Sequence, residues 1–225
     1  MRFFDAHAHL TAVPAFAGAW VIPGVDARTD AAAPTGPDVL RAVGLHPWYL
    51  DDLEPQLASL QERIGDDVVA IGETGLDAMD RAGPRDRQER AFRAQIRLAA
   101  EHDLPLILHV VRRHGACLQL LEDEGWSGAG MVHDFMGPVE MIQPWVRAGF
   151  LLSVSPRAVR RDKAAVAAAI PDEALLIETD DEGAEQIGAV ARWVAEARGA
   201  SVEEIAALTE ANGRRLFGRS ERAFP

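Results

Sequence analysis

The chain has very little of several residue types that mark particular classes of protein. Cys117 is the only cysteine among its 225 residues, so no internal disulfide is possible and nothing suggests an oxidising compartment. No run approaches the roughly 18 to 20 apolar residues that cross a bilayer. The first ten residues carry charged and histidine side chains in place of the apolar region of a signal peptide. We therefore expect a cytoplasmic protein with no membrane segment.

Lysine is almost absent as well, since Lys163 is the only one and the other basic residues are arginines. Acidic residues exceed basic ones, and the formal net charge is −12. An acidic surface repels polyanions at long range, which argues against broad binding to duplex phosphates. It leaves open a nuclease in which bound divalent cations and a few local arginines supply the positive charge.

The order of apolar and helix-like segments predicts one α/β domain spanning residues 1–225. No repeat, linker or low-complexity tract divides the chain, and short apolar runs alternate with longer amphipathic stretches. This alternation is typical of a parallel sheet wrapped by helices, and we expect a compact (β/α)8 TIM barrel. Residues 10–38 leave little room for a full first helix. We expect strands at 2–7, 19–23, 40–45, 68–73, 106–109, 130–133, 150–154 and 175–178, and helices at 83–102, 115–124, 138–148, 184–198 and 202–216, the last with a capping box of Ser201 and Glu204.

Polar side chains gather where the expected strands end. Most of these strands are apolar until their last residues and then reach a histidine or a carboxylate. The C-terminal ends of barrel strands converge on one face, where the active site lies, so these side chains are expected to meet. The residues in question are Asp5, His7, His9, His46, Glu73, Asp77, His109, His133, Asp134, Glu178, Asp180 and Asp181.

The spacing of these residues predicts a catalytic metal site. His7 and His9 are two apart on a strand, so both project to the same side and can bind one ion. Imidazole with carboxylate favours Zn, Mn, Fe, Co or Ni over an all-oxygen Ca or Mg site. Lys163 lies in a helix-like stretch, which leaves Glu73 as the carboxylate that would bridge two ions. Strand alternation favours Asp180 over its acidic neighbours as a ligand that also takes a proton from the attacking water.

Several further residues are expected around the ligands. Asp77 lies beyond its strand and is expected to orient a ligand histidine, and Asp134 to support His133 from the next position. His46 fits either a phosphate contact or a place behind the ligands. Trp48 and Tyr49 fit base stacking as well as packing over the barrel rim. The arginines after the fifth and seventh strands fit a phosphate clamp or solvated helix starts, and the clamp would consist of Arg112, Arg157 and Arg160.

The same residues carry a family resemblance across nearly the whole chain. The runs DAHAH, GLHP, GETGLD, LPLILH, VHDFMG, ETD and ANGRRLFG, in this order, resemble the TatD-like metal-dependent hydrolases. The resemblance implies a barrel with one to three metal ions and a deoxyribonuclease that removes nucleotides from DNA 3′ ends. It also implies a ligand set of His7, His9, Glu73, His109, His133 and Asp180.

Three positions depart from the pattern of this family. The usual HCFSG is HDFMG here, which puts Asp134 after His133. The arginine that commonly stands two residues after the histidine of the fifth strand is displaced by one position, to Arg112. The Ser-Pro-Tyr that usually follows ETD is replaced by Asp181, Glu182 and Gly183, and the loop behind it is missing.

We therefore expect a hydrolase of phosphodiester bonds that acts on DNA ends or on a small phosphodiester. It would use Asp180 and Glu73 as catalytic groups with two divalent ions, whose identity stays open among Zn, Mn, Mg, Co and Ni. A hydrolase of amides, esters or lactones is an alternative, because one ligand set serves many reactions. A metal-binding subunit of a larger assembly is a second alternative, suggested by the shortened loops. The oligomeric state is left open.

Overall fold

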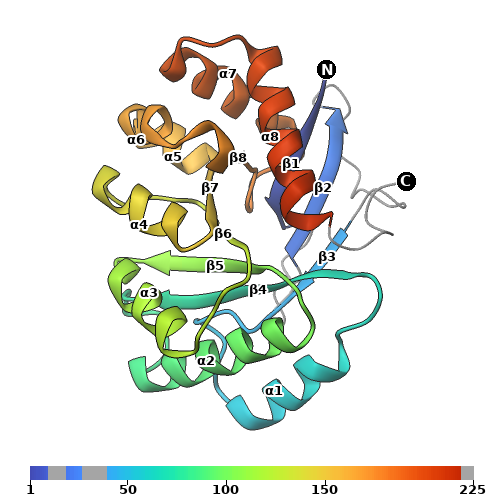
Figure 1. Ribbon diagram of the computed structural model, residues 1–225, viewed down its shortest axis with the longest axis vertical. Helices are drawn as coiled ribbons and strands as arrows, with labels where there is room; N and C mark the ends of the chain where they lie inside the picture. Colours follow the sequence, from blue (N-terminus) through green and yellow to red (C-terminus); the bar gives the residue numbers. More distant parts are fainter. Residues whose placement is uncertain (10–18, 27–39, 219–225) are drawn as a thin grey trace.

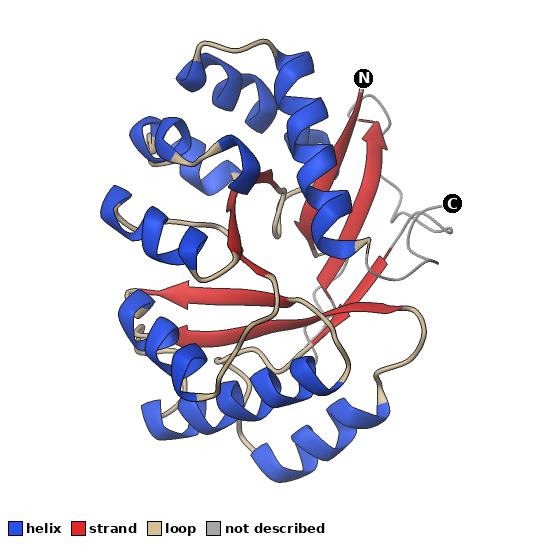
Figure 2. Ribbon diagram, in the orientation of Figure 1, coloured by secondary structure: helices blue, strands red, loops and turns tan. Residues whose placement is uncertain are grey.

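The protein is built around a curled eight-stranded sheet with helices on its outer side, as the computed structural model in Figures 1 and 2 shows. The structure describes residues 1–9, 19–26 and 40–218. The strands follow one another in chain order, which confirms the eight expected strands. Their bounds are β1 Arg2–Ala8, β2 Ala19–Asp26, β3 Leu40–Val43, β4 Val68–Asp77, β5 Leu106–Val111, β6 Gly130–Val132, β7 Phe150–Val154 and β8 Leu175–Ile177.

The expectation of parallel strands throughout is wrong for the first part of the sheet. β2 pairs antiparallel with both β1 and β3, and the pairs from β3 to β8 are parallel. Residues 9–18 connect β1 to β2. This is shorter than the dozen or more residues that a parallel crossover needs, whereas an antiparallel return needs few. Most of the 10–38 stretch, where little room for a helix was expected, lies outside the described residues.

Helices follow the parallel strands and cover the outer face of the sheet (Figure 2). The five expected helices are confirmed. Three helices were missed, two short ones that follow β7 and the longer α1 (Leu53–Glu62). The spacing of Leu53, Leu57 and Leu60 was a helical signal for α1. The helices after α1 are α2 Arg85–Glu101, α3 His114–Asp123, α4 Ile142–Arg147, α5 Pro156–Arg160, α6 Ala164–Ala169, α7 Ile187–Arg198 and α8 Val202–Phe217, with short 3-10 turns at Val139–Met141, Asp172–Ala174 and Ala184–Gln186.

An apolar cluster fills the barrel near the N-terminal ends of the strands. Phe217, at the end of α8, stacks on Phe4 of β1 with ring centroids 6.3 Å apart. Gly213 lets α8 approach this closely, because a Cβ there would collide with the Phe4 ring. The buried histidines and Glu73 lie at the opposite end of the barrel, near the C-terminal ends of the strands. The apolar cluster also includes Leu40, Val69, Ile107, Met131, Leu151, Leu176 and Leu216.

The two ends of the sheet meet beside the C-terminal ends of the strands. Ala8 forms a parallel bridge with Asp180, just beyond β8. The backbone N–H of His9 donates to the carbonyl of Asp180 at 2.7 Å, and the N–H of Asp180 donates to the carbonyl of His7 at 3.0 Å. These bonds bring the first histidines of the chain to a carboxylate more than 170 residues away. None of the helices that the structure describes is long and apolar enough to cross a membrane.

Candidate metal centre

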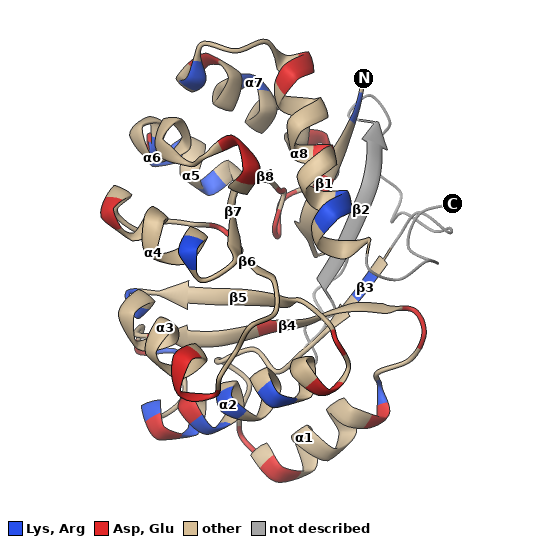
Figure 3. Ribbon diagram, viewed as in Figure 1, with Lys and Arg blue, Asp and Glu red and all other residues tan. Residues whose placement is uncertain are grey.

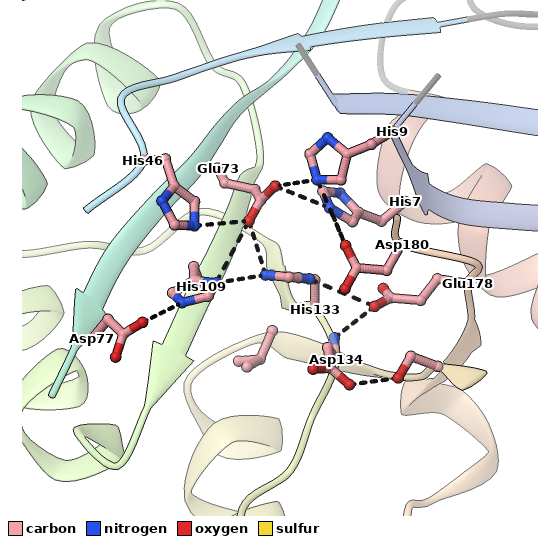
Figure 4. A network of polar contacts seen from close by, with 12 residues as sticks. His7, His9, His46, Glu73, Asp77, His109, His133, Asp134, Glu178 and Asp180 are labelled. Carbon is pink, nitrogen blue, oxygen red and sulfur yellow. Dashed lines mark hydrogen bonds and ion pairs between the residues drawn. The ribbon is translucent and has the colours of Figure 1, made fainter. Parts of the chain in front are cut away.

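Glu73, on β4, stands at the centre of a buried cluster of histidines (Figure 4). One carboxylate oxygen, Oε1, lies 3.2 Å from Nε2 of His7 and 2.7 Å from Nε2 of His9. The other oxygen, Oε2, faces three more rings. It lies 3.0 Å from Nε2 of His133, 3.5 Å from Nε2 of His46 and 3.6 Å from Nδ1 of His109. The two oxygens of one carboxylate thus face two separate groups of imidazoles.

Asp180 completes the group around His7 and His9. Its Oδ1 lies 3.8 Å from Nε2 of His7 and 3.6 Å from Nε2 of His9, and its side chain is 19% exposed. Strand alternation was the reason for choosing Asp180, but β8 ends at Ile177 and Asp180 has a left-handed backbone with φ of 55°. The turn after β8, held by the bonds to β1, is what directs this carboxylate into the cluster.

Three groups of side chains in the described residues have the geometry to hold an ion. They are His7, His9 and Glu73; His46, Glu73 and His109; and His7, His133 and Asp180. Nε2 of His7 and Oε1 of Glu73 are buried, and neither has a hydrogen-bond partner. Buried polar atoms without partners are costly. Separations near 3 Å between donor atoms suit bonds of about 2.0–2.2 Å to a shared divalent cation. The donor set therefore fits a divalent metal ion.

The charges within the cluster favour an ionised Glu73. Burial by itself would raise the pKa of Glu73, but His133 and His7, with hydrogen bonds from His109 and His133, hold it well below the usual range. Burial lowers the pKa of His46 to about 3. Burial would lower the pKa of His9 and His133 too, but contacts with Glu73 raise it. A metal ion binds neutral imidazoles, so its binding at these two rings would displace their protons.

Two further carboxylates contact His109 and His133 through the ring nitrogens that do not face Glu73. Oδ2 of Asp77 lies 3.1 Å from Nε2 of His109 and accepts a 2.6 Å hydrogen bond from Nε1 of Trp48. Oε1 of the buried Glu178 lies 3.5 Å from Nδ1 of His133. Contacts of this kind leave one ring nitrogen of each histidine directed at Glu73.

A family model described as TatD related DNase matches residues 23–218. The chain belongs to the TatD-related DNase family. Among its relatives, the uncharacterized metal-dependent hydrolase YabD of Bacillus subtilis is 34% identical over 80% of this chain and 77% of that protein. The 3′-5′ ssDNA/RNA exonuclease TatD of Citrobacter koseri is 33% identical over 78% of this chain and 76% of that protein. The deoxyribonuclease TATDN3 of Homo sapiens is 30% identical over 80% of this chain and 74% of that protein.

A solved structure of this family supports the same barrel. The crystal structure of the TatD homologue YjjV from Escherichia coli has a TM-score of 0.71 and 31% identity, covering 79% of this chain and 76% of YjjV. The expected fold class is thereby confirmed, with the antiparallel β2 as the correction. The expected family and its class, the metal-dependent hydrolases, are confirmed as well.

Beside the metal centre of this TatD-family chain lies a cavity of about 360 Å³. His109 and His133 form part of its wall, so the cavity adjoins the cluster. Arg112 and Arg157, two of the three expected phosphate contacts, also line it. Arg160 lies outside this cavity, and its guanidinium pairs with Glu182. The wall also includes Arg81 and Arg161.

Asp134, which stands where the TatD family usually has cysteine, is buried beside this cavity. Its carboxylate accepts a hydrogen bond from the Ser155 hydroxyl and pairs with Nη1 of Arg157 at 2.8 Å. Burial and the nearby Glu178 raise the pKa of Asp134 to about 6. Its backbone N–H donates to Oε1 of Glu178 at 2.7 Å. Asp134 thus connects Glu178, the carboxylate beside His133, to Arg157 in the wall of the cavity.

The sequence reasoning missed several residues of this site. Glu178 was considered only as a competitor of Asp180, and it lies behind His133. Arg81 was not considered, although it follows the end of β4 as Arg112 follows β5, and its Cζ lies 3.5 Å from the centre of the Trp48 ring. Asp5 was taken as part of a strand end, yet its carboxylate turns to Thr179 across the barrel seam. Of these three residues, only Arg81 could have been found by the signal used for the other arginines, a position shortly after the end of a strand.

Proposed function

We propose that this chain is a metal-dependent nuclease that removes nucleotides from the 3′ ends of single-stranded DNA. The observation that carries the proposal is the position of Glu73, whose two oxygens face separate groups of histidines. One carboxylate between two groups of ligands fits two divalent ions that share it. The names of the relatives, which include a ssDNA/RNA exonuclease and a deoxyribonuclease, support the choice of substrate.

The proposed metal ligands are divided between two positions. His7, His9 and Asp180 with Oε1 of Glu73 would hold one ion, and His109, His133 and Oε2 of Glu73 the other. His46 lies close enough to Oε2 to serve at the second position. When bound, divalent ions lower the pKa of an attacking water toward about 7 and screen the charge that develops on phosphate oxygens.

Asp180 is proposed as the general base. It is the more exposed of the two carboxylates in the cluster, at 19% against 3% for Glu73, so it can reach a water in the open part of the site. Its backbone is fixed by hydrogen bonds to His7 and His9, so its position does not depend on substrate. A carboxylate in this place accepts the proton of the water that attacks phosphorus.

The arginines beside the cluster favour a phosphodiester over a neutral amide, ester or lactone. In a chain with a net charge of −12, the wall of the adjoining cavity carries four arginines and one carboxylate. Guanidinium groups match phosphate oxygens and have no such partner in a neutral lactone. This charge distribution would steer an anionic substrate to an otherwise acidic molecule.

The proposal is tested with metal analysis of the purified protein and a screen of Mn, Mg, Zn and Co. The substrates are 3′-labelled and 5′-labelled single-stranded DNA, a chromogenic phosphodiester and a lactone. We expect stepwise loss of nucleotides from the 3′ end and little lactone turnover. The Asp180→Asn variant should lose at least about 100-fold in kcat, because general base catalysis contributes about that much.

Asp181→Asn is the matched control, since this neighbour is exposed and has the same side chain. It should leave kcat within about twofold. Retained metal in the inactive Asp180→Asn protein would place the defect in proton transfer. Full activity of Asp180→Asn would refute the assignment of the base, and lactone turnover that exceeds DNA cleavage would refute the nuclease.

A further inference from the structure

The cavity beside the proposed metal centre is lined by four arginines. We propose that Arg81, Arg112, Arg157 and Arg161 bind the phosphate next to the scissile one, so that the enzyme recognises a strand carrying two consecutive phosphates. This inference rests on the proposed nuclease function and specifies its substrate. The scissile phosphate lies at the metal cluster, and its neighbour lies in the cavity of about 360 Å³. The volume is within the range of pockets that hold small ligands.

Two arginines of the cavity lack the acidic partner that most arginines of α2 have. On α2, Arg85 lies 2.6 Å from Glu89 and Arg93 lies 2.8 Å from Asp123, and Figure 3 shows acidic and basic positions side by side along this helix. In the part of the chain that the structure describes, Arg112 and Arg161 pair with no carboxylate. The cavity therefore contains two arginines whose charge no carboxylate of the described residues pairs with.

The remaining two arginines are held in place by their neighbours. Arg157 pairs with the buried Asp134, whose other oxygen accepts from Ser155, so the guanidinium is anchored on one side and 42% exposed on the other. The Arg81 guanidinium rests on the Trp48 ring, and Trp48 is itself hydrogen-bonded to Asp77. Groups that are fixed before binding lose less entropy when an anion arrives.

The position of the cavity identifies which anion it takes. His109 and His133, two of the proposed ligands, form its inner wall, so an anion there lies next to one held by the metal centre. A polynucleotide presents phosphates in such succession, whereas a chromogenic phosphodiester has only one. Asp134 supplies a single negative charge to the wall, and its contacts with Arg157 and Ser155 occupy it.

Adjacent residues offer a matched pair of variants. Arg161 lines the cavity, whereas Arg160 pairs with Glu182 outside it. Binding of adenosine 3′,5′-bisphosphate and of adenosine 5′-monophosphate is measured by calorimetry on the Mn2+-loaded full chain. We expect the bisphosphate to bind wild type about tenfold more tightly, as a charge-assisted contact allows. Arg161→Gln should weaken binding of the bisphosphate by about fivefold or more and leave the affinity for the monophosphate within about twofold of wild type.

Arg160→Gln should leave both affinities unchanged. For single-stranded DNA, loss of one phosphate contact should reduce the slope of log Kd against log salt by about 0.7 in Arg161→Gln. Equal weakening of both nucleotides in Arg161→Gln would overturn the proposal, because the arginines would then bind the scissile phosphate itself. Equal binding of both nucleotides to wild type would overturn it too.

The two proposals fail in different ways. If the wild-type protein cleaves DNA but does not prefer the bisphosphate, the second phosphate site is refuted and the proposed nuclease function stands. A clear preference that Arg161→Gln abolishes, in a protein that cleaves no DNA, would support the site and refute the nuclease.

Discussion

Asp77, at the last position of β4, connects a metal-centre histidine to an aromatic side chain. Oδ2 accepts from Nε1 of Trp48 and lies 3.1 Å from Nε2 of His109, while Oδ1 accepts from the N–H of Met79 at 2.7 Å. Burial alone would raise the pKa of Asp77, but the bonds from His109 and Trp48 hold it below its usual range. An ionised Asp77 keeps the ring proton on Nε2 of His109. The lone pair of Nδ1, which lies 3.0 Å from Nε2 of His133, is then available to a cation shared by the two rings.

Replacement of Asp77 by asparagine should weaken metal binding. An amide can no longer impose one tautomer on His109, and loss of such a supporting group typically costs about 10–100-fold in metal affinity. We expect a loss of this size for Asp77→Asn in competition titrations with a fluorescent chelator. Circular dichroism and the free energy of unfolding of the metal-free protein report whether the fold is retained.

Trp48→Phe provides the comparison, because it removes the other hydrogen bond to Asp77 and keeps an aromatic ring. Its metal affinity should stay within about threefold of wild type if the contact with His109 is the important one. Unchanged affinity in Asp77→Asn would show that His109 is not held through Asp77.

At this scale the sequence predicted the cluster of histidines and carboxylates better than the arrangement of the arginines. Histidines and carboxylates at strand ends were predictable because strand ends converge in any barrel of this type. The side-chain direction of an arginine in a loop follows no such rule. Arg160 and Arg161 are adjacent and look alike in the sequence, yet one pairs with Glu182 and the other lines the cavity.

Among the elements, α8 shows how a local signal determines where a helix begins. The Ser201 side chain accepts from the N–H of Glu204 at 3.2 Å, and the Glu204 carboxylate accepts from the N–H of Ser201 at 2.7 Å. This confirms the capping box expected from the sequence. Two N–H groups that the first turn leaves unpaired are satisfied in this way.

Ser201→Ala should lower the free energy of unfolding by about 1 kcal/mol, the usual cost of losing an N-cap. Urea denaturation followed by circular dichroism measures it. Glu203→Ala, in the same turn but outside the capping box, is the control and should cost less. Equal losses in the two variants would argue against the cap as the cause.

The contribution of Glu204 should depend on pH. Hydrogen bonds from the backbone and side chain of Ser201 lower the pKa of Glu204. A carboxylate whose pKa is lower in the folded state stabilises the fold above its unfolded-state pKa and loses this effect as the pH falls through the folded value. The stability difference between wild type and Glu204→Ala should therefore be full at pH 7 and shrink below about pH 4.

The direction of the second strand, β2, was not predicted from the sequence. Both parallel and antiparallel strands can be short apolar runs, so residues 19–23 looked like one more strand of a parallel barrel. The length of the connection from β1 to β2 was available as a signal. It favours the antiparallel return that the structure has.

On the scale of the whole molecule, Asp5 and Thr179 close the barrel. The Thr179 hydroxyl donates to Oδ2 of Asp5 at 2.6 Å and its N–H donates to Oδ1 at 3.0 Å. These residues lie 174 positions apart, at the two ends of the sheet. The same seam places Asp180 against His7 and His9, so the fold and the metal centre depend on one set of contacts.

Thr179→Val should destabilise the whole domain. It leaves the buried Asp5 carboxylate without its hydroxyl donor, and an unsatisfied buried group costs about 1–3 kcal/mol. The free energy of unfolding in urea measures this cost. Thr179→Ser keeps the hydroxyl and loses one methyl group, so its loss should be about 1 kcal/mol or less. A Val variant as stable as the Ser variant would show that the hydroxyl does not hold the seam.

The sequence by itself determined the barrel, its eight strands, the family and the histidines and carboxylates that lie together at the strand ends. These follow from local patterns and from the convergence of strand ends that the barrel geometry imposes. Only the tertiary structure decided that β2 runs antiparallel, that Glu73 divides the histidines into two groups, and which arginines line the cavity. Each of these depends on how side chains and strands distant in the sequence are oriented toward one another. Apart from the length of the β1–β2 connection, spacing along the sequence does not determine that orientation.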